Sequence, residues 1–242
     1  PRAIRDVYKR QAEVKSLYGG RRSEYCDCCL VWDDEERFDD DDAAARELEE
    51  KKRARFAVLK RFKQHGRGTW KTHSIVINSK PLRQRLVEIF SDYPGIDSHA
   101  LELEFEDPFL PFVHRWPKLS SDIANETDEE GRQHMELLAN AVSSEVAESI
   151  KTLYKVETTR FATFDDLKVL YVPGETVMQT KNEVESAGIL RDVRRTKVDG
   201  VNVYIFRVDI VEWNGVSCGV ASEYWHQIEF HGSLSLEKLM VL

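Results

Sequence analysis

One segment of the sequence matches a motif of serine hydrolases. Gly215-Val216-Ser217-Cys218-Gly219 fits G-x-S-x-G, in which the serine stands on a sharp turn between a strand and a helix. The residues after this motif instead alternate as a strand does. The histidines there, His226 and His231, are too close in sequence for the separate loops that catalytic triads usually draw on. A hydrolase that uses Ser217 or Cys218 with a nearby histidine is therefore an alternative that its context disfavours.

Three of the four cysteines lie together, at Cys26, Cys28 and Cys29. A tetrahedral zinc site usually takes ligands two to four residues apart and a second pair elsewhere in the chain. Cys218 and the scattered histidines supply no such second pair, so no metal site is predicted. Four cysteines without a secretory signal favour a reducing compartment, and we predict an intracellular, cytoplasmic protein.

Residues 66–72 read Gly-Arg-Gly-Thr-Trp-Lys-Thr and end like a phosphate-binding loop. That loop needs glycine immediately before its lysine, because backbone N–H groups must wrap around the phosphate. Trp70 occupies that position, so no nucleotide or other cofactor is predicted for this chain.

The net charge of −8 hides two opposite blocks. Residues 33–50 carry eleven acidic residues against two arginines, whereas residues 51–71 carry nine lysines or arginines and no acidic residue. Acidic groups at the start of a helix and basic groups towards its end both suit the helix dipole. We therefore predict that residues 1–71 are a charged leader, partly disordered and partly helical. The alternative is a docking arm, in which segment 51–71 with Trp70 binds single-stranded nucleic acid. The acidic balance of the whole chain disfavours nucleic-acid binding.

The globular pattern begins after this leader. Residues 74–78 predict a buried strand, and Asn78 or Ser79 can cap a helix whose first turn holds Pro81. Alternation over residues 101–106 predicts a strand with one face in solvent.

Residues 107–119 are rich in aromatic residues and contain prolines at 108, 111 and 117. Proline interrupts helices and sheet interiors, so we predict an ordered coil there. Its aromatic rings belong in a core, which leaves neighbouring polar side chains free to face a groove. His114, Arg115 and Trp116 are the candidate partner-binding residues, and no catalytic residue is predicted.

The clearest helix is predicted over residues 128–154, with Thr127 and Glu130 as a capping box. A second capping box, Thr163 with Asp166, predicts a short helix that ends before Pro173-Gly174.

After this short helix, apolar residues recur at every second position, as they do in a strand. Strands are predicted from Val177 onwards and over residues 185–197, 201–211 and 222–230. Asp199-Gly200 and Asn214-Gly215 predict two-residue hairpins between them. The predicted class is α+β: a mixed sheet with packed helices, followed by a small curled antiparallel sheet or barrel.

Several landmarks follow one another over residues 72–242. They are IVINS before a helix, DYPG at 92–95, DPFLPFVHRW at 107–116, the long charged helix, TFDDLKVLYVPGETV at 163–177, and SLSLEKLMVL at the end. In this order they resemble the domain of unknown function that precedes the ATPase module in filamentous-fungal AAA-type ATPases. The chain has Tyr171-Val172 where that family usually has Phe-Lys.

The resemblance implies that residues 72–242 are the N-terminal domain of an AAA-type ATPase, with an α/β part at 72–160 and a β-rich part at 161–242. It places the Walker motifs, and with them ATP and magnesium, beyond Leu242. The implied role is non-catalytic recognition of a client protein or regulation, and a ring oligomer would be a property of the ATPase module. The chain lacks a starting methionine and ends in an apolar stretch, which we interpret as a fragment, and no apolar run is long enough to span a membrane.

Overall fold

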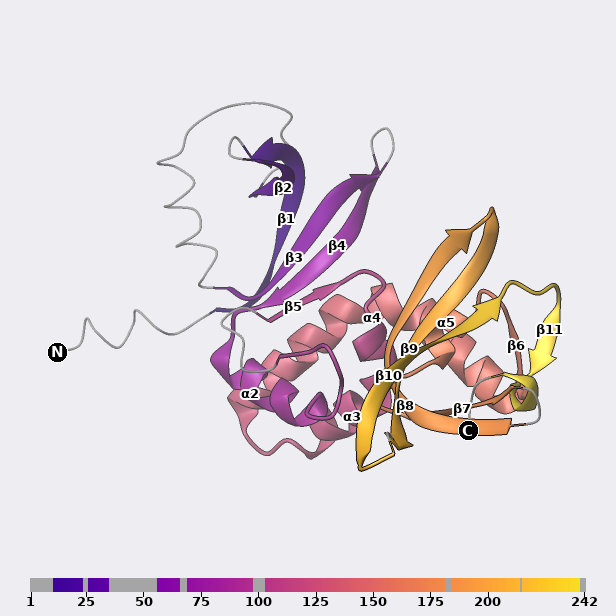
Figure 1. The fold of residues 1–242 in the computed structure, drawn as a ribbon. Helices are drawn as coiled ribbons and strands as arrows, with labels where there is room; N and C mark the ends of the chain where they lie inside the picture. Colours follow the sequence, from indigo (N-terminus) through magenta and orange to yellow (C-terminus); the bar gives the residue numbers. More distant parts are fainter. Residues whose placement is uncertain are drawn as a thin grey trace. The chain divides into compact units, whose positions relative to one another are not determined.

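A computed structural model gives the fold of the chain (Figure 1). It describes residues 11–23, 26–34, 56–65, 69–97, 103–181, 184–213 and 215–239, and for residues 11, 12, 20–23, 26–31, 33 and 181 it describes the backbone alone. Helices and sheets are both present, which confirms the predicted α+β class. The chain divides into two compact units, residues 1–91 with 97–146 and residues 92–96 with 147–242.

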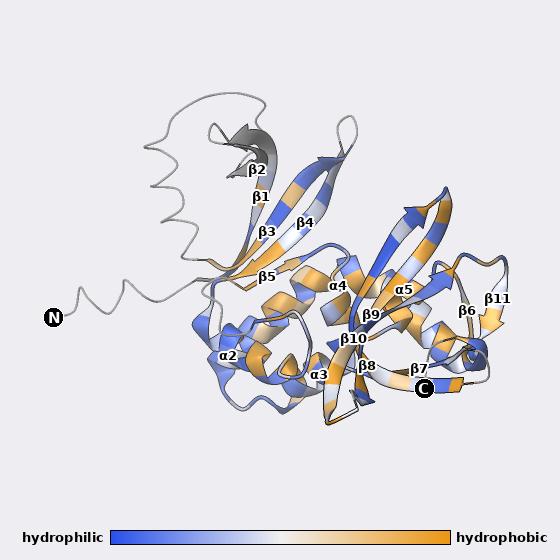
Figure 2. Cartoon of the chain, in the orientation of Figure 1, coloured by the Kyte–Doolittle hydropathy of each residue, from blue (hydrophilic) through white to orange (hydrophobic). Residues whose placement is uncertain are grey.

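The first unit is built on a mixed sheet, as predicted. Its strands run in the order β2-β1-β3-β4-β5, and β1 is parallel to β3 while the other neighbours are antiparallel. The strands are β1 (Gln11–Ser23), β2 (Cys26–Asp33), β3 (Phe56–His65), β4 (Thr69–Ile77) and β5 (Leu103–Glu106). In Figure 2 the first half of β3 and the second half of β4 are coloured as hydrophobic, and these halves are the buried ones.

The described part of residues 1–71 is strand rather than helix or disorder, so that prediction is wrong for these residues. The basic segment contributes β3, in which Ala57, Val58 and Leu59 are all buried. Consecutive buried residues suit a strand with both faces covered, which tertiary packing alone provides. The predicted end of the leader, residue 71, lies inside β4. Residues 35–55, with most of the acidic block, lie outside the described residues.

Helix α2 (Lys80–Ile89) begins as predicted. Ser79 is its N-cap, and the Ser79 Oγ accepts a hydrogen bond from the Leu82 N–H at 3.3 Å. Proline lies in the first turn, where its missing N–H has no partner to lose.

Helix α3 (Leu110–Asn125) replaces the coil that the prolines predict. Pro111 lies in the first turn, which tolerates proline, but Pro117 lies inside the helix and removes a backbone hydrogen bond. Phe112, Val113 and Leu119 are buried along the helix, and this packing offsets the local cost of Pro117.

Helix α4 (Glu129–Thr159) confirms the predicted long helix and extends beyond it. Its apolar stripe is buried where the pattern predicts, at Met135, Leu138, Val142 and Val146.

The second unit carries an antiparallel sheet in the order β10-β9-β8-β7, and a small pair of strands, β6 with β11. Its elements are β6 (Phe161–Thr163), α5 (Leu167–Leu170), β7 (Thr176–Lys181), β8 (Val184–Val198), β9 (Val201–Trp213), β10 (Cys218–Ile228), β11 (Ser233–Ser235) and η2 (Leu236–Lys238). The sequence predicted either a curled sheet or a barrel. Within the described residues the strands form an open sheet. The two hydrogen bonds of the second predicted capping box are present, because the Thr163 N–H donates to Asp166 Oδ2 at 2.9 Å and the Asp166 N–H donates to Thr163 Oγ1 at 3.4 Å. They close a turn just before α5, which begins at Leu167 with Asp166 as its N-cap.

One of the two hairpin predictions is confirmed. Asp199 and Gly200 have φ of 50° and 83°, and Val198 pairs with Val201 around them. In contrast, Trp213 pairs with Cys218, so residues 214–217 join β9 to β10 and the predicted two-residue turn is wrong. Asn214 itself lies outside the described residues.

One face of this sheet closes the core of the second unit. Its inward side chains alternate along the strands and pack with residues of α4, α5 and η2; those from the sheet are Val177, Leu190, Tyr204, Phe206, Val208 and Trp225. The side chains between them therefore form the outer face.

Candidate functional site

The hydrolase motif and the histidines lie far apart in the fold. Ser217 ends the β9–β10 connection and Cys218 begins β10. His226 lies eight positions further along the same strand, roughly 26 Å away at about 3.3 Å per residue. His231 follows the end of β10. The structure does not bring Ser217 or Cys218 together with either histidine.

His114, Arg115 and Trp116 lie in α3, and each is half-buried. Successive helix residues point about 100° apart, so these three side chains do not share one face. Partner binding by them stays a prediction.

Three cations of the described basic segment already have carboxylate partners. Their ion pairs are Lys60 Nζ–Glu145 Oε1 at 2.7 Å, Arg61 NH1–Glu104 Oε1 at 2.9 Å and Lys71 Nζ–Asp107 Oδ2 at 2.7 Å. Trp70 packs edge-on against Tyr18, with ring centroids 5.2 Å apart. These side chains hold the first unit together, which weakens the case for a nucleic-acid groove.

Glu145 is the most enclosed carboxylate of these three pairs. Burial alone would raise the pKa of Glu145, but hydrogen bonds from Lys60 Nζ and Thr72 Oγ1, together with the Lys60 charge, lower it below its ordinary value. Glu145 is therefore ionised and structural.

One serine and one histidine do meet, in the first unit. Ser79 Oγ lies 2.8 Å from His134 Nδ1, and both residues are buried. Because the Ser79 oxygen also accepts the α2 cap hydrogen bond, the pair anchors a helix end inside the core. Its burial leaves no room for a substrate.

Among the described residues, no group of three or more His, Cys, Asp or Glu is placed to hold a metal ion. The side chains of Cys26, Cys28 and Cys29 lie outside the description, and Cys218 is an exposed free thiol. No helix in the described part of the chain has the length and apolar character needed to span a membrane.

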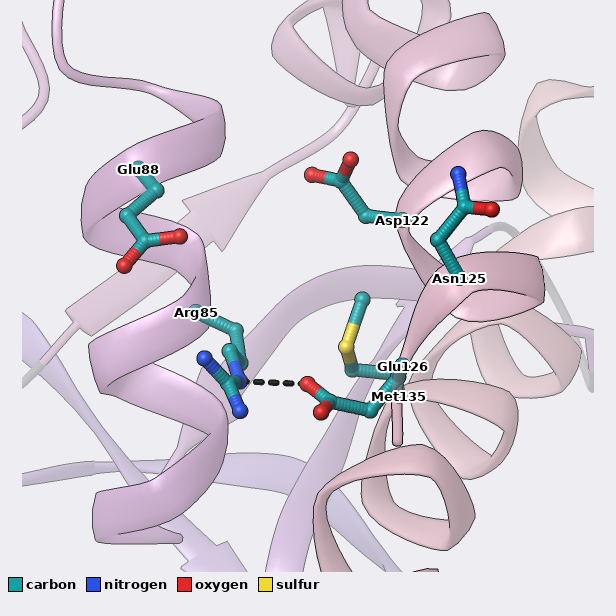
Figure 3. A pocket seen from close by; sticks show the side chains of 6 residues that line it. All are labelled: Arg85, Glu88, Asp122, Asn125, Glu126 and Met135. Carbon is teal, nitrogen blue, oxygen red and sulfur yellow. Dashed lines mark ion pairs between the residues drawn. The ribbon is translucent and has the colours of Figure 1, made fainter. Parts of the chain in front are cut away.

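A polar pocket of about 220 Å³ lies in the first unit (Figure 3). Its lining is Arg85, Glu88, Asp122, Asn125, Glu126 and Met135. Arg85 Nε contacts Glu126 Oε2 at 2.5 Å, and only 8% of the Glu126 side chain is exposed. The central ion pair therefore connects α2 to the end of α3, so these two charged groups stabilise the fold and are not available to bind a ligand.

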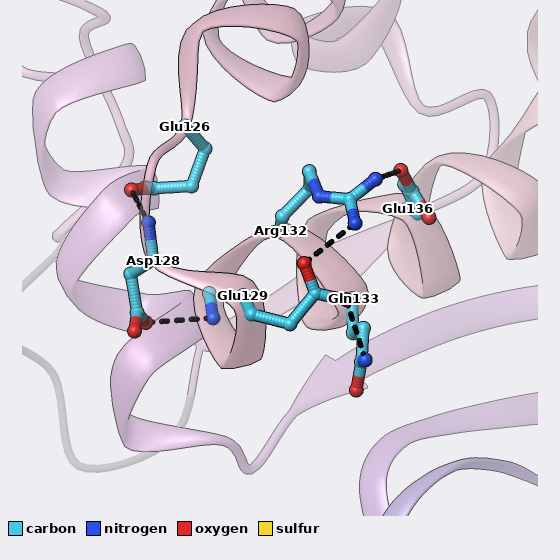
Figure 4. A network of polar contacts seen from close by, with 7 residues as sticks. Glu126, Asp128, Glu129, Arg132, Gln133 and Glu136 are labelled. Atoms are coloured by element: carbon cyan, nitrogen blue, oxygen red, sulfur yellow. Dashed lines mark hydrogen bonds and ion pairs between the residues drawn. The ribbon is translucent and has the colours of Figure 1, made fainter.

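Glu126 also helps to start α4 (Figure 4). It accepts the Asp128 N–H at 3.0 Å, and Asp128 Oδ2 accepts the Gly131 N–H at 2.8 Å. The helix is thus capped by Asp128, and the predicted Thr127–Glu130 box is wrong because a carboxylate one residue later meets the free N–H groups and the helix dipole.

Arg132 and its neighbours complete the first turns of α4, as Figure 4 shows. Arg132 contacts Glu129 at 2.6 Å and Glu136 at 3.1 Å, and Gln133 donates to Glu129 at 2.8 Å. The hydrogen bond from Arg132 is the main reason that the pKa of Glu129 lies below its ordinary value. This network supports a helix end rather than a ligand.

A second hollow, of about 380 Å³, lies on the outer face of the sheet in the second unit. We call it the sheet-face groove; it is lined by Asp192, Arg194, Ile205, Arg207, Tyr224 and His226. The strand register arranges these side chains in two rows. One row is Asp192, Arg207 and Tyr224, and the other is Arg194, Ile205 and His226. Each of three adjacent strands thus contributes one side chain to each row.

The carboxylates on this face have cationic partners. Arg194 Nε contacts Asp192 Oδ2 at 2.6 Å, and Arg191 Nε contacts Asp209 Oδ2 at 2.7 Å. The Ser222 hydroxyl, followed by Arg191, lowers the pKa of Asp209 below its ordinary value.

Arg207 differs from these arginines, because it forms no ion pair within 4 Å in the described part of the chain. It lies between Asp192, which pairs with Arg194, and the exposed ring of Tyr224. A guanidinium can bind a carboxylate through two parallel hydrogen bonds, and Tyr224 and Ile205 offer apolar contact beside it. The sheet-face groove is suited to an anionic group on an otherwise extended ligand.

Of the residues that line this groove, only His226 was named from the sequence. The alternation of apolar and polar residues along the strands could have identified Arg194, Arg207 and Tyr224 as well, because it marks them as outward-facing. It does not indicate which of them lie side by side, because that depends on register.

The comparisons with known proteins concern the same half of the molecule. No curated protein and no solved structure matches the chain. Residues 152–242, from the last turns of α4 to the end, match the family model described as a domain of unknown function (DUF7025).

Proposed function

We propose that this chain is a non-catalytic recognition domain of an AAA-type ATPase, and that it binds an acidic segment of a client protein in the sheet-face groove. The first part rests on the succession of sequence landmarks, and the family match at residues 152–242 is to a domain of unknown function. In this proposal ATP, magnesium and ring assembly belong to an ATPase module encoded after Leu242.

Binding of an acidic segment in the groove rests on one observation: among the described residues, Arg207 forms no ion pair within 4 Å. The two carboxylates nearest to it in the sheet, Asp192 and Asp209, contact Arg194 and Arg191 instead. The charge of Arg207 adds a small part to the lowered pKa of Asp209, but among the described residues Arg207 forms no ion pair within 4 Å, and a client carboxylate would supply one. Charged hydrogen bonds of this kind contribute about 1.5–3 kcal/mol each.

Peptide binding tests the groove. The probe is a fluorescein-labelled peptide of about twelve residues, rich in Asp and Glu with one aromatic residue, and its matched control replaces each acid by its amide. We expect saturable anisotropy for the acidic peptide alone. Arg207→Ala should weaken binding about 10- to 100-fold, which corresponds to the energy above. Lys197→Ala removes the same charge from β8 outside the groove lining and should change little.

Equal binding of the two peptides, or equal effects of Arg207→Ala and Lys197→Ala, would contradict peptide binding in the sheet-face groove.

The AAA-type assignment has separate tests. Calorimetric titration of the chain with ATP and magnesium should show no binding, because the sequence has no G-x-x-x-x-G-K-[ST] loop. The coding sequence after Leu242 should contain that loop between a strand and a helix, and a stop codon there would contradict the assignment.

A further inference from the structure

Strand β10 is an outer strand of its sheet within the described residues (Figure 1). The Glu229 N–H donates to the Asn202 carbonyl at 3.0 Å and continues the register in which Ile228 lies opposite Val203. Hydrogen-bonded and non-hydrogen-bonded pairs alternate along an antiparallel ladder. The odd-numbered residues of β10 therefore bond to β9. The even-numbered ones direct their N–H and C=O groups away from the sheet.

The side chains of the same even-numbered residues lie on the outer face. Val220, Tyr224 and Ile228 are 73%, 64% and 61% exposed. Native edge strands are usually protected by lysines, prolines, bulges or short length. β10 has eleven residues, no Lys, Arg or Pro, and an unbroken register with β9. Its one carboxylate, Glu223, accepts the Trp225 indole N–H at 2.8 Å.

The other edge strand gives a contrast within the same sheet. β7 has six residues and ends at Lys181. Short length is one of the usual protections, and β10 lacks it. A long, apolar and unprotected edge is a template for another strand, so β10 is the edge that a partner would cover.

From Val220 to the end of β10 the even-numbered residues read Val220, Ser222, Tyr224, His226 and Ile228, and their character is symmetrical about Tyr224; Cys218, the first even-numbered residue, lies outside this symmetrical stretch. We propose that β10 pairs antiparallel with β10 of a second copy of this chain, centred on Tyr224. Val220 then lies opposite the partner's Ile228, and Ser222 lies opposite the partner's His226. The two Tyr224 rings meet at the twofold axis, and the residues in these pairs direct their hydrogen-bonding groups outward. The Ile228 carbonyl, which accepts a hydrogen bond from Gln227 Nε2 at 3.1 Å, would exchange it for one from the partner strand.

The odd-numbered residues are compatible with this register. Ala221 lies opposite the partner's Gln227 and Glu223 lies opposite the partner's Trp225, so no like charges meet. Registers displaced by two residues lose the match. Centring on Glu223 places Val220 against the partner's His226, and centring on Trp225 places Ile228 against the partner's Ser222. Of these three registers, only the one centred on Tyr224 pairs the outward apolar residues with each other and the outward polar residues with each other.

Sedimentation equilibrium of the full chain tests the dimer. We expect a mass of twice 28.1 kDa at micromolar concentration. Val220→Glu and Ile228→Lys should each weaken dimerisation at least about tenfold, because each sets two charges against apolar partner residues. The double variant should regain dimerisation, because the new carboxylate at position 220 would then lie opposite the new ammonium group at position 228 in both symmetry-related pairs. Val220→Glu with His226→Lys is the register control and should stay monomeric.

A variant of the backbone provides an independent check. Ser222→Pro removes an outward N–H that the β9 ladder does not use, so it should give a folded monomer, whereas Ser222→Ala should stay dimeric. Circular dichroism reports the fold of each variant. A monomeric wild type, single variants that dimerise normally, or a dimeric register control would overturn the proposal. Arg207→Ala should leave the dimer intact, so failure of the groove and failure of the dimer are distinguishable.

Discussion

At the scale of single residues, several charged groups of the described part of the chain tie distant elements together. Lys60 is one example. Its ammonium donates to Glu145 Oε1 at 2.7 Å and to the Ala141 carbonyl at 3.3 Å, so it joins β3 to α4. Thr72 adds a second hydrogen bond to the same carboxylate oxygen from β4. Two strands and a helix thus depend on one ionised carboxylate.

Replacing Glu145 by glutamine should therefore change how stability depends on pH. The folded pKa of Glu145 lies below its ordinary value of 4.5, so the ionised carboxylate stabilises the fold above that pH. This contribution is lost as the pH falls through the folded pKa. We expect Glu145→Gln to lower the free energy of unfolding by about 1–2 kcal/mol at pH 7 and by progressively less below about pH 4.5.

Urea denaturation of both proteins over a pH series measures this difference. Glu148→Gln is the matched control, because Glu148 lies in the same helix with a side chain that is 85% exposed and pairs with exposed Lys151. Its effect should be small at every pH. Parallel loss of stability by wild type and Glu145→Gln between pH 7 and pH 3 would contradict the role of the carboxylate.

At the scale of elements, the start of α2 couples a helix cap to a buried hydrogen bond. Ser79→Ala should remove the acceptor of the Leu82 N–H and leave His134 Nδ1 without its partner. The cap contributes about 0.5–2 kcal/mol and an unsatisfied buried polar atom costs about 1–3 kcal/mol, so we expect a total loss of about 2–4 kcal/mol. Chemical denaturation measures it. Ser91→Ala, at an exposed serine just after the same helix, should have almost no effect, and equal losses in both variants would refute this coupling.

Strand packing in the second unit depends on one close approach. A Cβ on Gly188 would lie 2.6 Å from the Asp209 carbonyl oxygen and 2.6 Å from Val208 Cγ1, whereas a Cβ on Gly219 meets nothing within 4 Å. Gly188→Ala should therefore cost about 1–3 kcal/mol through overpacking, and Gly219→Ala less than about 0.5 kcal/mol. Both glycines lie in strands of the same sheet, which makes them a matched pair for thermal unfolding. A larger effect at Gly219 would show that the β8–β9 contact is not the cause.

At the scale of the whole molecule, the charge of the sequence and the charge offered to a partner differ. Lys60, Arg61 and Lys71 pair with carboxylates from distant parts of the first unit, so much of the described basic segment is neutralised in place. We expect a labelled single-stranded oligonucleotide to bind no more tightly than about 10⁻⁴ M at physiological salt, as measured by anisotropy. Micromolar binding that weakens steeply with salt would instead favour the nucleic-acid alternative.

Much of the local structure was predictable because local atoms determine it. Ser79 with Pro81, Thr163 with Asp166, and Asp199 with Gly200 set backbone angles or hydrogen bonds within a few residues, and the structure has a cap or a turn at each. The β8–β9 register follows from that turn, so the position of Arg194 opposite Ile205 could have been deduced. Where the turn prediction is wrong, the register prediction is wrong with it. A two-residue turn at Asn214-Gly215 would place Tyr224 opposite Ile205 instead of Arg207.

The sequence by itself determined the α+β class, the start of α2, the end of α5 before Pro173-Gly174, the long helix and the outward faces of the strands, because these depend on neighbours within about a helical turn or a tight hairpin. Only the tertiary structure decided that residues 56–65 of the basic segment form a strand, that α3 continues through Pro117, and that Arg207 lies between Asp192 and Tyr224. Each of these depends on burial or pairing between residues distant in the chain. Such contacts outweigh local preferences of about 1–3 kcal/mol, and no window of the sequence contains both partners.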